Sequence, residues 1–186
     1  MTKSEELQNL KNLMEEDDSL PLKKGADKLV FGSGNSEAAI LLIGEAPGKN
    51  ENTQGLPFIG QSGKLLDKLL DLAGLERKKV FITNIIHHRP PENRDPLSDE
   101  VKAYGKYLDR IINIIKPKMI ITLGRFSMNK FLPDVKISEV HGKSFKVGEY
   151  LIIPMYHPAA SLRNGKILEA EKADFVDLKM HLSEIL

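Results

Sequence analysis

The side chains best suited to chemistry lie in three polar segments of the sequence. The segments are GEAPGKNENTQGLPFIG (44–60), TNIIHHRPPENRDP (83–96) and HPAASLRNGK (157–166). Carboxylates, amides and imidazoles can hold water and move protons, and an aromatic ring can stack on a flat ligand. The candidates of these kinds are Glu45, Glu51, Phe58, Asn84, Asn93 and His157.

Apolar runs come before or begin these segments, which places the candidates at strand ends. Runs at 38–45, 78–86, 118–124 and 150–155 lack polar alternation, which is typical of strands buried on both faces. They alternate with helical patterns such as QSGKLLDKLLDLAG, and Ser98 is suited to cap the helix before Pro117. The pattern predicts a three-layer α/β/α sandwich with a central, mainly parallel four-stranded sheet. The segments should then meet at its carboxyl edge, where ligands bind.

Composition is typical of one globular domain spanning residues 1–186, with residues 1–24 as an N-terminal helix and linker. The chain has 27 basic and 26 acidic residues, a net charge of +1, and no cysteine. Cysteine-ligated metal sites, disulfides and thiolate nucleophiles are therefore excluded. No apolar run approaches the roughly 20 residues that span a bilayer. We expect a cytoplasmic, soluble monomer.

Simpler interpretations compete with a catalytic site. GEAPG does not match G-x-G-x-x-G, so nucleotide binding is weakly supported. A metal site built from His87, His88, His157, Glu45 and Glu51 is also conceivable, although adjacent histidines rarely point the same way on a strand. Taken singly, each candidate could also be structural, for example a buried Phe that anchors a loop.

Three quoted motifs, taken together, resemble the uracil-DNA glycosylase superfamily, and most closely its family 4. GEAPGKNENTQGLPFIGQSGKLL, FITNIIHHRPPENRDP and MYHPAASLR follow one another in family order. The resemblance implies hydrolysis of the N-glycosidic bond of uracil in DNA, as in base excision repair, leaving an abasic site and free uracil. Two alternatives stay open: another deaminated base such as hypoxanthine or xanthine, or a protein that binds such DNA without turnover.

The resemblance also implies roles for individual residues. Phe58 would stack on a flipped uracil and Asn84 would pair with its edge, with Gly44 and Ala46 beside it. His157 would hydrogen-bond the base O2, Glu51 and Asn93 would place the water, and Glu45 would support the pocket. The residues expected to contact DNA are Ser161, Leu162, Arg163, Arg89, Arg94 and Lys166.

The sequence departs from family 4 at all four cluster-binding positions. Family 4 enzymes carry four cysteines that hold an iron–sulfur cluster, and the corresponding positions are interpreted here as Leu10, Leu13, His88 and Tyr104. We therefore expect no metal and no cofactor. Leu10 and Leu13 are expected to fill the former cluster site as apolar core, together with His88 and Tyr104.

Overall fold

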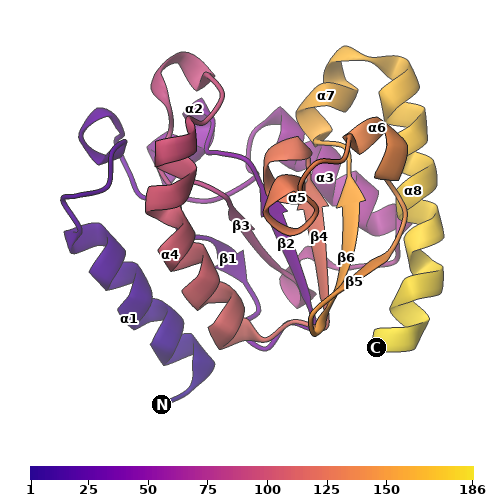
Figure 1. Cartoon of the computed structure of the whole chain (residues 1–186), viewed down its shortest axis with the longest axis horizontal. Coiled ribbons are helices and arrows are strands. Elements are labelled where there is room, and N and C mark those ends of the chain that lie inside the picture. Colours follow the sequence, from indigo (N-terminus) through magenta and orange to yellow (C-terminus); the bar gives the residue numbers. More distant parts are fainter.

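A computed structural model describes all residues, 1–186. It is built on one sheet with the strand order β1-β3-β2-β4-β6-β5 (Figure 1). The inner strands β3, β2, β4 and β6 are parallel, and β1 and β5 pair antiparallel at the edges. The strands are β1 (Ser33–Gly34), β2 (Ile40–Gly44), β3 (Phe81–Asn84), β4 (Met119–Leu123), β5 (Phe145–Val147) and β6 (Tyr150–Met155).

The predicted mixed α/β architecture is confirmed, but the sheet has six strands where four were expected. The two additional strands are two and three residues long. Neither forms an apolar run, because each lies at an edge and pairs on one side only. They extend the sheet without changing its parallel centre.

Helices cover both faces of the sheet. In Figure 1, α1 lies beside α4 at one side and α8 forms the opposite side. The helices are α1 (Lys3–Glu16), α2 (Lys49–Gln54), α3 (Gln61–Leu72), α4 (Ser98–Ile115), α5 (Arg125–Phe131), α6 (Ile137–Val140), α7 (Pro158–Arg163) and α8 (Gly165–Ile185). Single 3₁₀ turns occur at Lys23–Gly25, Arg77–Lys79 and Pro91–Asn93. No helix is both long and apolar enough to span a membrane.

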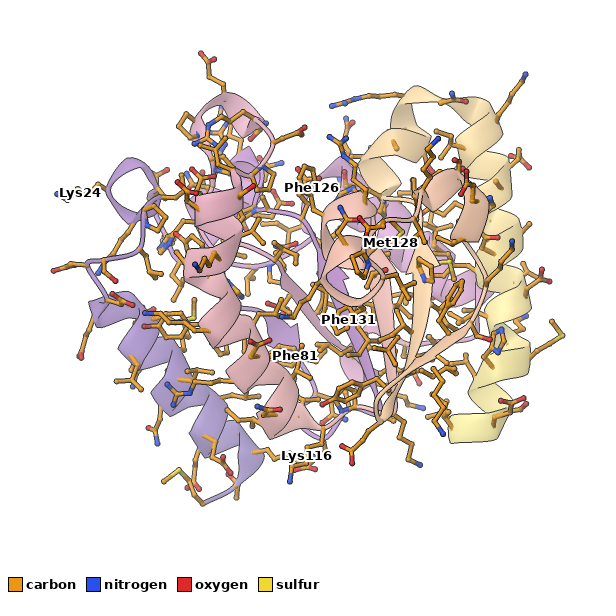
Figure 2. The ribbon with its side chains drawn as sticks, in the orientation of Figure 1. Lys24, Phe81, Lys116, Phe126, Met128 and Phe131 are labelled. Atoms are coloured by element: carbon orange, nitrogen blue, oxygen red, sulfur yellow. The ribbon has the colours of Figure 1, made fainter.

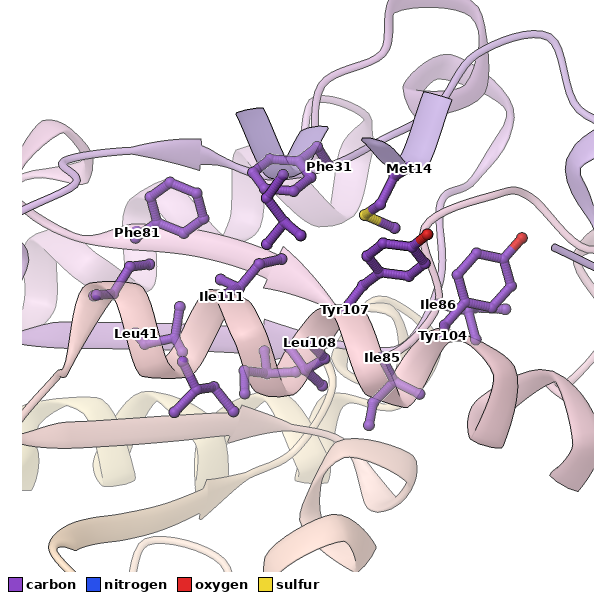
Figure 3. Packing of buried hydrophobic residues seen from close by; sticks show 14 of the residues in the cluster. Met14, Phe31, Leu41, Phe81, Ile85, Ile86, Tyr104, Tyr107, Leu108 and Ile111 are labelled. Carbon is purple, nitrogen blue, oxygen red and sulfur yellow. The ribbon is translucent and has the colours of Figure 1, made fainter. Parts of the chain in front are cut away.

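Alternate residues of each strand enter two separate cores. Leu41 and Ile43 pack with α1 and α4, whereas Ile40 and Leu42 pack with α3 and α8. Figure 3 shows the first core, where Leu41 lies near Leu108 and Ile111 of α4. Burial on both faces explains why the strands read as continuous apolar runs.

Figure 2 shows where charged side chains leave this framework. Lys24 projects from the turn after α1, and Lys116 lies at the lower end of α4. Lys116 has a φ of 50°, so α4 ends in the left-handed region directly before Pro117. The predicted C-terminal limit of α4 is therefore confirmed. At its start Leu97, not Ser98, is the cap residue, and its N–H donates to the Glu100 carboxylate at 2.8 Å.

Two of the polar segments, which carry no predicted helix, contain helices. The segment 44–60 holds α2, which runs from Gly48 as cap to Gly55, whose φ of 76° ends it. The segment 157–166 holds α7 and the first residues of α8. α2 buries only Asn52, so its sequence carries no apolar periodicity that would reveal a helix.

Candidate active site

A pocket of about 560 Å³ opens at the carboxyl ends of the parallel strands. Residues after β2, β3, β4 and β6 line it, so the three polar segments converge as expected for a parallel sheet. The strand that follows β2 in the sequence, β3, lies on one side of β2, and β4 lies on its other side. The strand order therefore reverses at β2, which is where ligands bind in such sheets. Of the predicted residues, the pocket is lined by Glu45, Ala46, Glu51, Phe58, Asn84, Asn93, Arg94, His157 and Arg163.

Gly44 is absent from the pocket wall, and its role is steric. It ends β2 directly opposite Asn84 of β3. A Cβ at Gly44 would lie 2.5 Å from both the Asn84 Oδ1 and the Phe58 Cζ. Only glycine allows the Phe58 ring and the Asn84 amide to approach each other across this strand end.

Phe58 is held in a left-handed conformation by a residue that the sequence analysis missed. Its φ is 50° and its side chain is buried. The Arg77 guanidinium donates to the Phe58 carbonyl at 2.8 Å and to the Pro57 carbonyl at 2.6 Å, and it pairs with Asp67 at 2.9 Å. Arg77 lies in a polar turn far along the chain, so nothing in its sequence context signals this contact.

Asn84 presents an unused hydrogen-bonding atom to the pocket. The residue is buried, and its Oδ1 has no hydrogen-bond partner within the protein. Leaving a buried amide oxygen unpaired costs about 1–3 kcal/mol, so such an atom usually has a ligand or a water as partner. A planar ligand that stacks on Phe58 and donates to Asn84 would satisfy it.

His157 caps α7 and faces Phe58. Its Nδ1 accepts from the Ala159 N–H at 3.0 Å, so the neutral ring carries its hydrogen on Nε2. The His157 and Phe58 rings stack with centroids 5.6 Å apart. Burial, assisted by Arg163, lowers the pKa of His157 to about 4, although Glu51 acts in the opposite direction. Near neutral pH the ring is therefore an uncharged donor.

Glu51 is oriented by backbone groups. One carboxylate oxygen, Oε1, accepts from the Ile59 N–H at 3.1 Å and the Gly60 N–H at 3.0 Å. The other oxygen, Oε2, forms no hydrogen bond in the protein and lies close to Gly48. Glu51 thus links α2 to the backbone at residues 59 and 60, and its second oxygen remains available to a water in the pocket.

Asn93 is oriented in a comparable way by Arg89. The Arg89 Nε donates to the Asn93 Oδ1 at 2.7 Å, which leaves the Asn93 Nδ2 free to donate into the pocket. Glu92 and Asn93 have φ values of 54° and 56°, two successive left-handed residues. Arg89 does not line the pocket and, in this structure, contacts Asn93.

Two further wall residues, Asp95 and Arg125, were missed by the sequence analysis. They form an ion pair at 2.7 Å between the segment after β3 and the start of α5. Burial raises the pKa of Glu45, and Asp95 adds to the rise, while Arg125 opposes it. The only sequence signal for Arg125 is its position directly after the strand 119–123 and Gly124.

The residues predicted to contact DNA separate into two groups. Leu162 and Lys166 are exposed, as is Arg163, which also lines the pocket. Ser161, in contrast, is 3% exposed and bonds Glu171 of α8, so its side chain faces α8 and not the solvent. Arg94 lines the pocket. Its guanidinium nitrogens Nη2 and Nη1 donate to the two carboxylate oxygens of Glu100 at 2.6 and 3.0 Å.

Neither a metal site nor a cluster site is formed by these side chains. No group of three or more His, Asp or Glu side chains is arranged to hold a metal ion. His87 bonds Thr83 at 3.1 Å and His88 bonds Tyr104 at 2.7 Å, away from His157. Iron–sulfur clusters are held mainly by thiolates, whereas here the His88 imidazole and the Tyr104 phenol bond each other.

Three of the four residues expected to repack the cluster position are buried, and one is not. Leu10, His88 and Tyr104 are buried, but Leu13 is 48% exposed on α1, so it does not fill that site. Figure 3 shows Tyr104 next to Ile85 and Ile86, with Tyr107 beside Met14. The turn at 22–23 lies near His88 and Tyr104 instead. Burial lowers the pKa of His88, and Lys23 lowers it further. Burial raises the pKa of Tyr104, which the Leu22 backbone opposes.

The fold and site define an α/β protein with a polar pocket at the carboxyl edge of a parallel sheet. The family model described as "Uracil DNA glycosylase superfamily" matches residues 31–179, which include every strand and the whole pocket. The chain belongs to the uracil-DNA glycosylase superfamily.

Curated relatives are similar over most of the chain. A type-4 uracil-DNA glycosylase of Saccharolobus solfataricus is 46% identical over 164 residues, covering 83% of this chain and 76% of the relative. Those of Sulfurisphaera tokodaii and Archaeoglobus fulgidus are 44% and 42% identical, covering 81% and 83% of this chain and 73% and 82% of the relatives. A type-5 enzyme of Thermus thermophilus is 32% identical over 55% of this chain and 53% of its own length.

Proposed function

We propose that the protein is a monofunctional uracil-DNA glycosylase that hydrolyses the bond between uracil and deoxyribose. The observation that carries the proposal is the unpaired Oδ1 of buried Asn84 beside the Phe58 ring. Bases inside a duplex are out of reach, so the target nucleotide must be turned out into the pocket. Membership of the superfamily supports the same reaction.

Base selection would depend on the Asn84 amide. Its Nδ2 would donate to the uracil O4, and its Oδ1 would accept from the uracil N3–H. Cytosine presents a donor at C4 and an acceptor at N3, so both pairs would become repulsive. A site that holds an amide rigidly can reject such an analogue strongly, because its buried polar atoms stay unpaired.

Bond cleavage would use His157, Glu51 and Asn93. As the bond from C1′ to N1 breaks, its electron pair passes to the base, and the His157 Nε2–H would donate to the O2 that gains charge. The Glu51 Oε2 and the Asn93 Nδ2 would hold a water near C1′. The carboxylate would favour the positive sugar and accept the proton as water adds.

Contacts to DNA would come from the exposed end of α7. Leu162 is a large apolar side chain in solvent, suited to enter the stack where the base has left. Arg163 lies next to it, and Lys166 follows on α8, where both could meet phosphates. No lysine lines the pocket, which supports hydrolysis by water without a Schiff base.

Two further proposals concern cofactor and assembly. The chain acts without an iron–sulfur cluster or other metal, because the sequence has no cysteine and His88 bonds Tyr104. It acts as a monomer, since each residue assigned a role above belongs to one chain and one pocket or its rim.

The test uses end-labelled oligonucleotides with a single uracil, hypoxanthine or xanthine, followed by alkaline cleavage of abasic sites. We expect strand scission with uracil alone, at a rate that a metal chelator does not change. Scission only with the purine lesions would overturn the uracil assignment. Tight binding without scission would indicate a DNA-binding relative, and inhibition by the chelator would overturn the metal-free proposal.

A further inference from the structure

Helix α7 connects the base pocket to the DNA-facing surface. His157 caps its first turn, and Leu162 and Arg163 lie at its last turn. The helix has six residues, so its position must be set by contacts to neighbouring elements. Figure 1 shows it at the end of the molecule where α8 begins, and the two helices pack against each other.

The central contact between these helices is a buried polar pair. Ser161 Oγ donates to Glu171 Oε2, and both residues are almost inaccessible to solvent, at 3% and 0% exposure. The second carboxyl oxygen of Glu171, Oε1, has no partner. None of the roles proposed for the reaction uses this carboxyl group.

Burial, together with one neighbouring acid, disfavours a carboxylate at Glu171. Burial raises the pKa of Glu171 to about 7, and Asp174 on the same helix adds to the rise, whereas the Ser161 bond opposes it. Asp174 binds His141, which follows α6, at 2.7 Å. The ion pairs made by α3 and α8 do not include Glu171.

We propose that Glu171 is a positioning residue that fixes α7 through Ser161 and thereby places His157 and Arg163 at the pocket. This inference rests on the proposed glycosylase function for its kinetic consequence. With the carboxyl group neutral, the Ser161–Glu171 bond buries no charge, and only Oε1 lacks a partner. When the group loses its proton, a buried carboxylate with one unpaired oxygen faces Asp174, and α7 must shift to admit water.

A small shift of α7 would matter for catalysis. A displacement of about 1 Å at a reacting group can cost up to ~10²-fold in rate. We therefore expect the single-turnover rate of uracil excision by the wild-type chain to fall about tenfold between pH 6 and pH 8.5. The fall should follow the ionisation of Glu171.

The decisive variant is Glu171→Gln, which keeps the shape and a bond to Ser161 but cannot ionise. Its rate should match the wild type at pH 6 and stay level to pH 8.5. Ser161→Ala should have a lower excision rate at every pH, because α7 loses its hydrogen bond to Glu171. Glu169→Gln is the matched control: it removes the same charge from an exposed position on α8 and should keep the wild-type profile.

A second measurement does not depend on activity. In the wild type, the NMR signals of the His157 ring should shift with a midpoint near pH 7, and in Glu171→Gln this step should be absent. The same step in both proteins, or an alkaline fall in the rate of Glu171→Gln, would overturn the proposal. An inactive wild type that shows the NMR step would overturn the glycosylase function but leave the positioning role of Glu171 supported.

Discussion

At the scale of single residues, Glu51 uses its two carboxylate oxygens differently. Oε1 is fixed by two backbone N–H groups, whereas Oε2 is free toward the pocket. A carboxylate that only stabilised the segment 44–60 would have no reason to keep one oxygen unpaired beside Gly48. A substitution that keeps the Oε1 contacts but removes the negative charge therefore tests the role of the charge alone.

Glu51→Gln should lower the single-turnover rate of uracil excision by about 10²-fold, as expected for a group that acts in the transition state. The amide oxygen can still accept from Ile59 and Gly60, so the fold and the affinity for DNA should be retained. Glu92→Gln, which removes the same charge from an exposed position in the segment after β3, is the control. A rate for Glu51→Gln near that of the wild type would show that Glu51 is structural.

Residue types and order were sufficient to predict most of the pocket, because parallel strands bring their carboxyl ends together. Contacts between distant polar side chains were not predictable. Glu171 and Asp95 read as ordinary charged residues in polar segments, and their partners lie 10 and 30 positions away. The burial of the Ser161 side chain was not predictable, because the sequence does not show which face of α7 meets α8.

At the scale of elements, the turn that carries Phe58 depends on support from a separate segment. Arg77 belongs to the 3₁₀ turn before β3, yet it binds the carbonyls of Pro57 and Phe58. Gly63 of α3 also packs closely, since a Cβ there would lie 1.8 Å from the Phe58 carbonyl oxygen. The left-handed Phe58 is thus enforced by α3 and by this 3₁₀ turn.

Arg77→Met should destabilise the protein by about 1–3 kcal/mol, because charged hydrogen bonds to two carbonyls are lost. It should also lower kcat/KM about tenfold, since the Phe58 ring loses its fixed position. Urea unfolding and steady-state kinetics measure the two effects. Lys79→Met, an exposed residue of the same turn, is the control and should change neither. Equal behaviour of the two variants would show that Arg77 does not hold Phe58.

Secondary structure was predicted well where an element buries an apolar face, as in α3, α4 and the four inner strands. It was missed where an element is short and polar. α2 begins and ends at glycines and buries only Asn52, and α7 has six residues capped by His157. Such elements are held by tertiary contacts more than by their own periodicity.

At the scale of the whole molecule, buried titratable groups make the stability depend on pH. Burial lowers the pKa of His87 to about 3 and the pKa values of His88 and His157 to about 4. Between those values and the unfolded value of about 6.5, the unfolded chain binds more protons, so stability falls as pH decreases. Glu171 acts with the opposite sign, because its raised pKa makes the folded chain bind more protons between about 4.5 and 7.

Two substitutions should therefore change the pH dependence in opposite directions. His87→Phe removes a buried ring whose Nδ1 has no partner, so the loss of unfolding free energy between pH 6.5 and pH 4 should become smaller. Glu171→Gln should make that loss larger, since the opposing group is gone. Each unit of pKa shift corresponds to about 1.4 kcal/mol, so slopes from urea unfolding at several pH values can resolve both. Parallel slopes for the wild type and His87→Phe would show that His87 is not held neutral by burial.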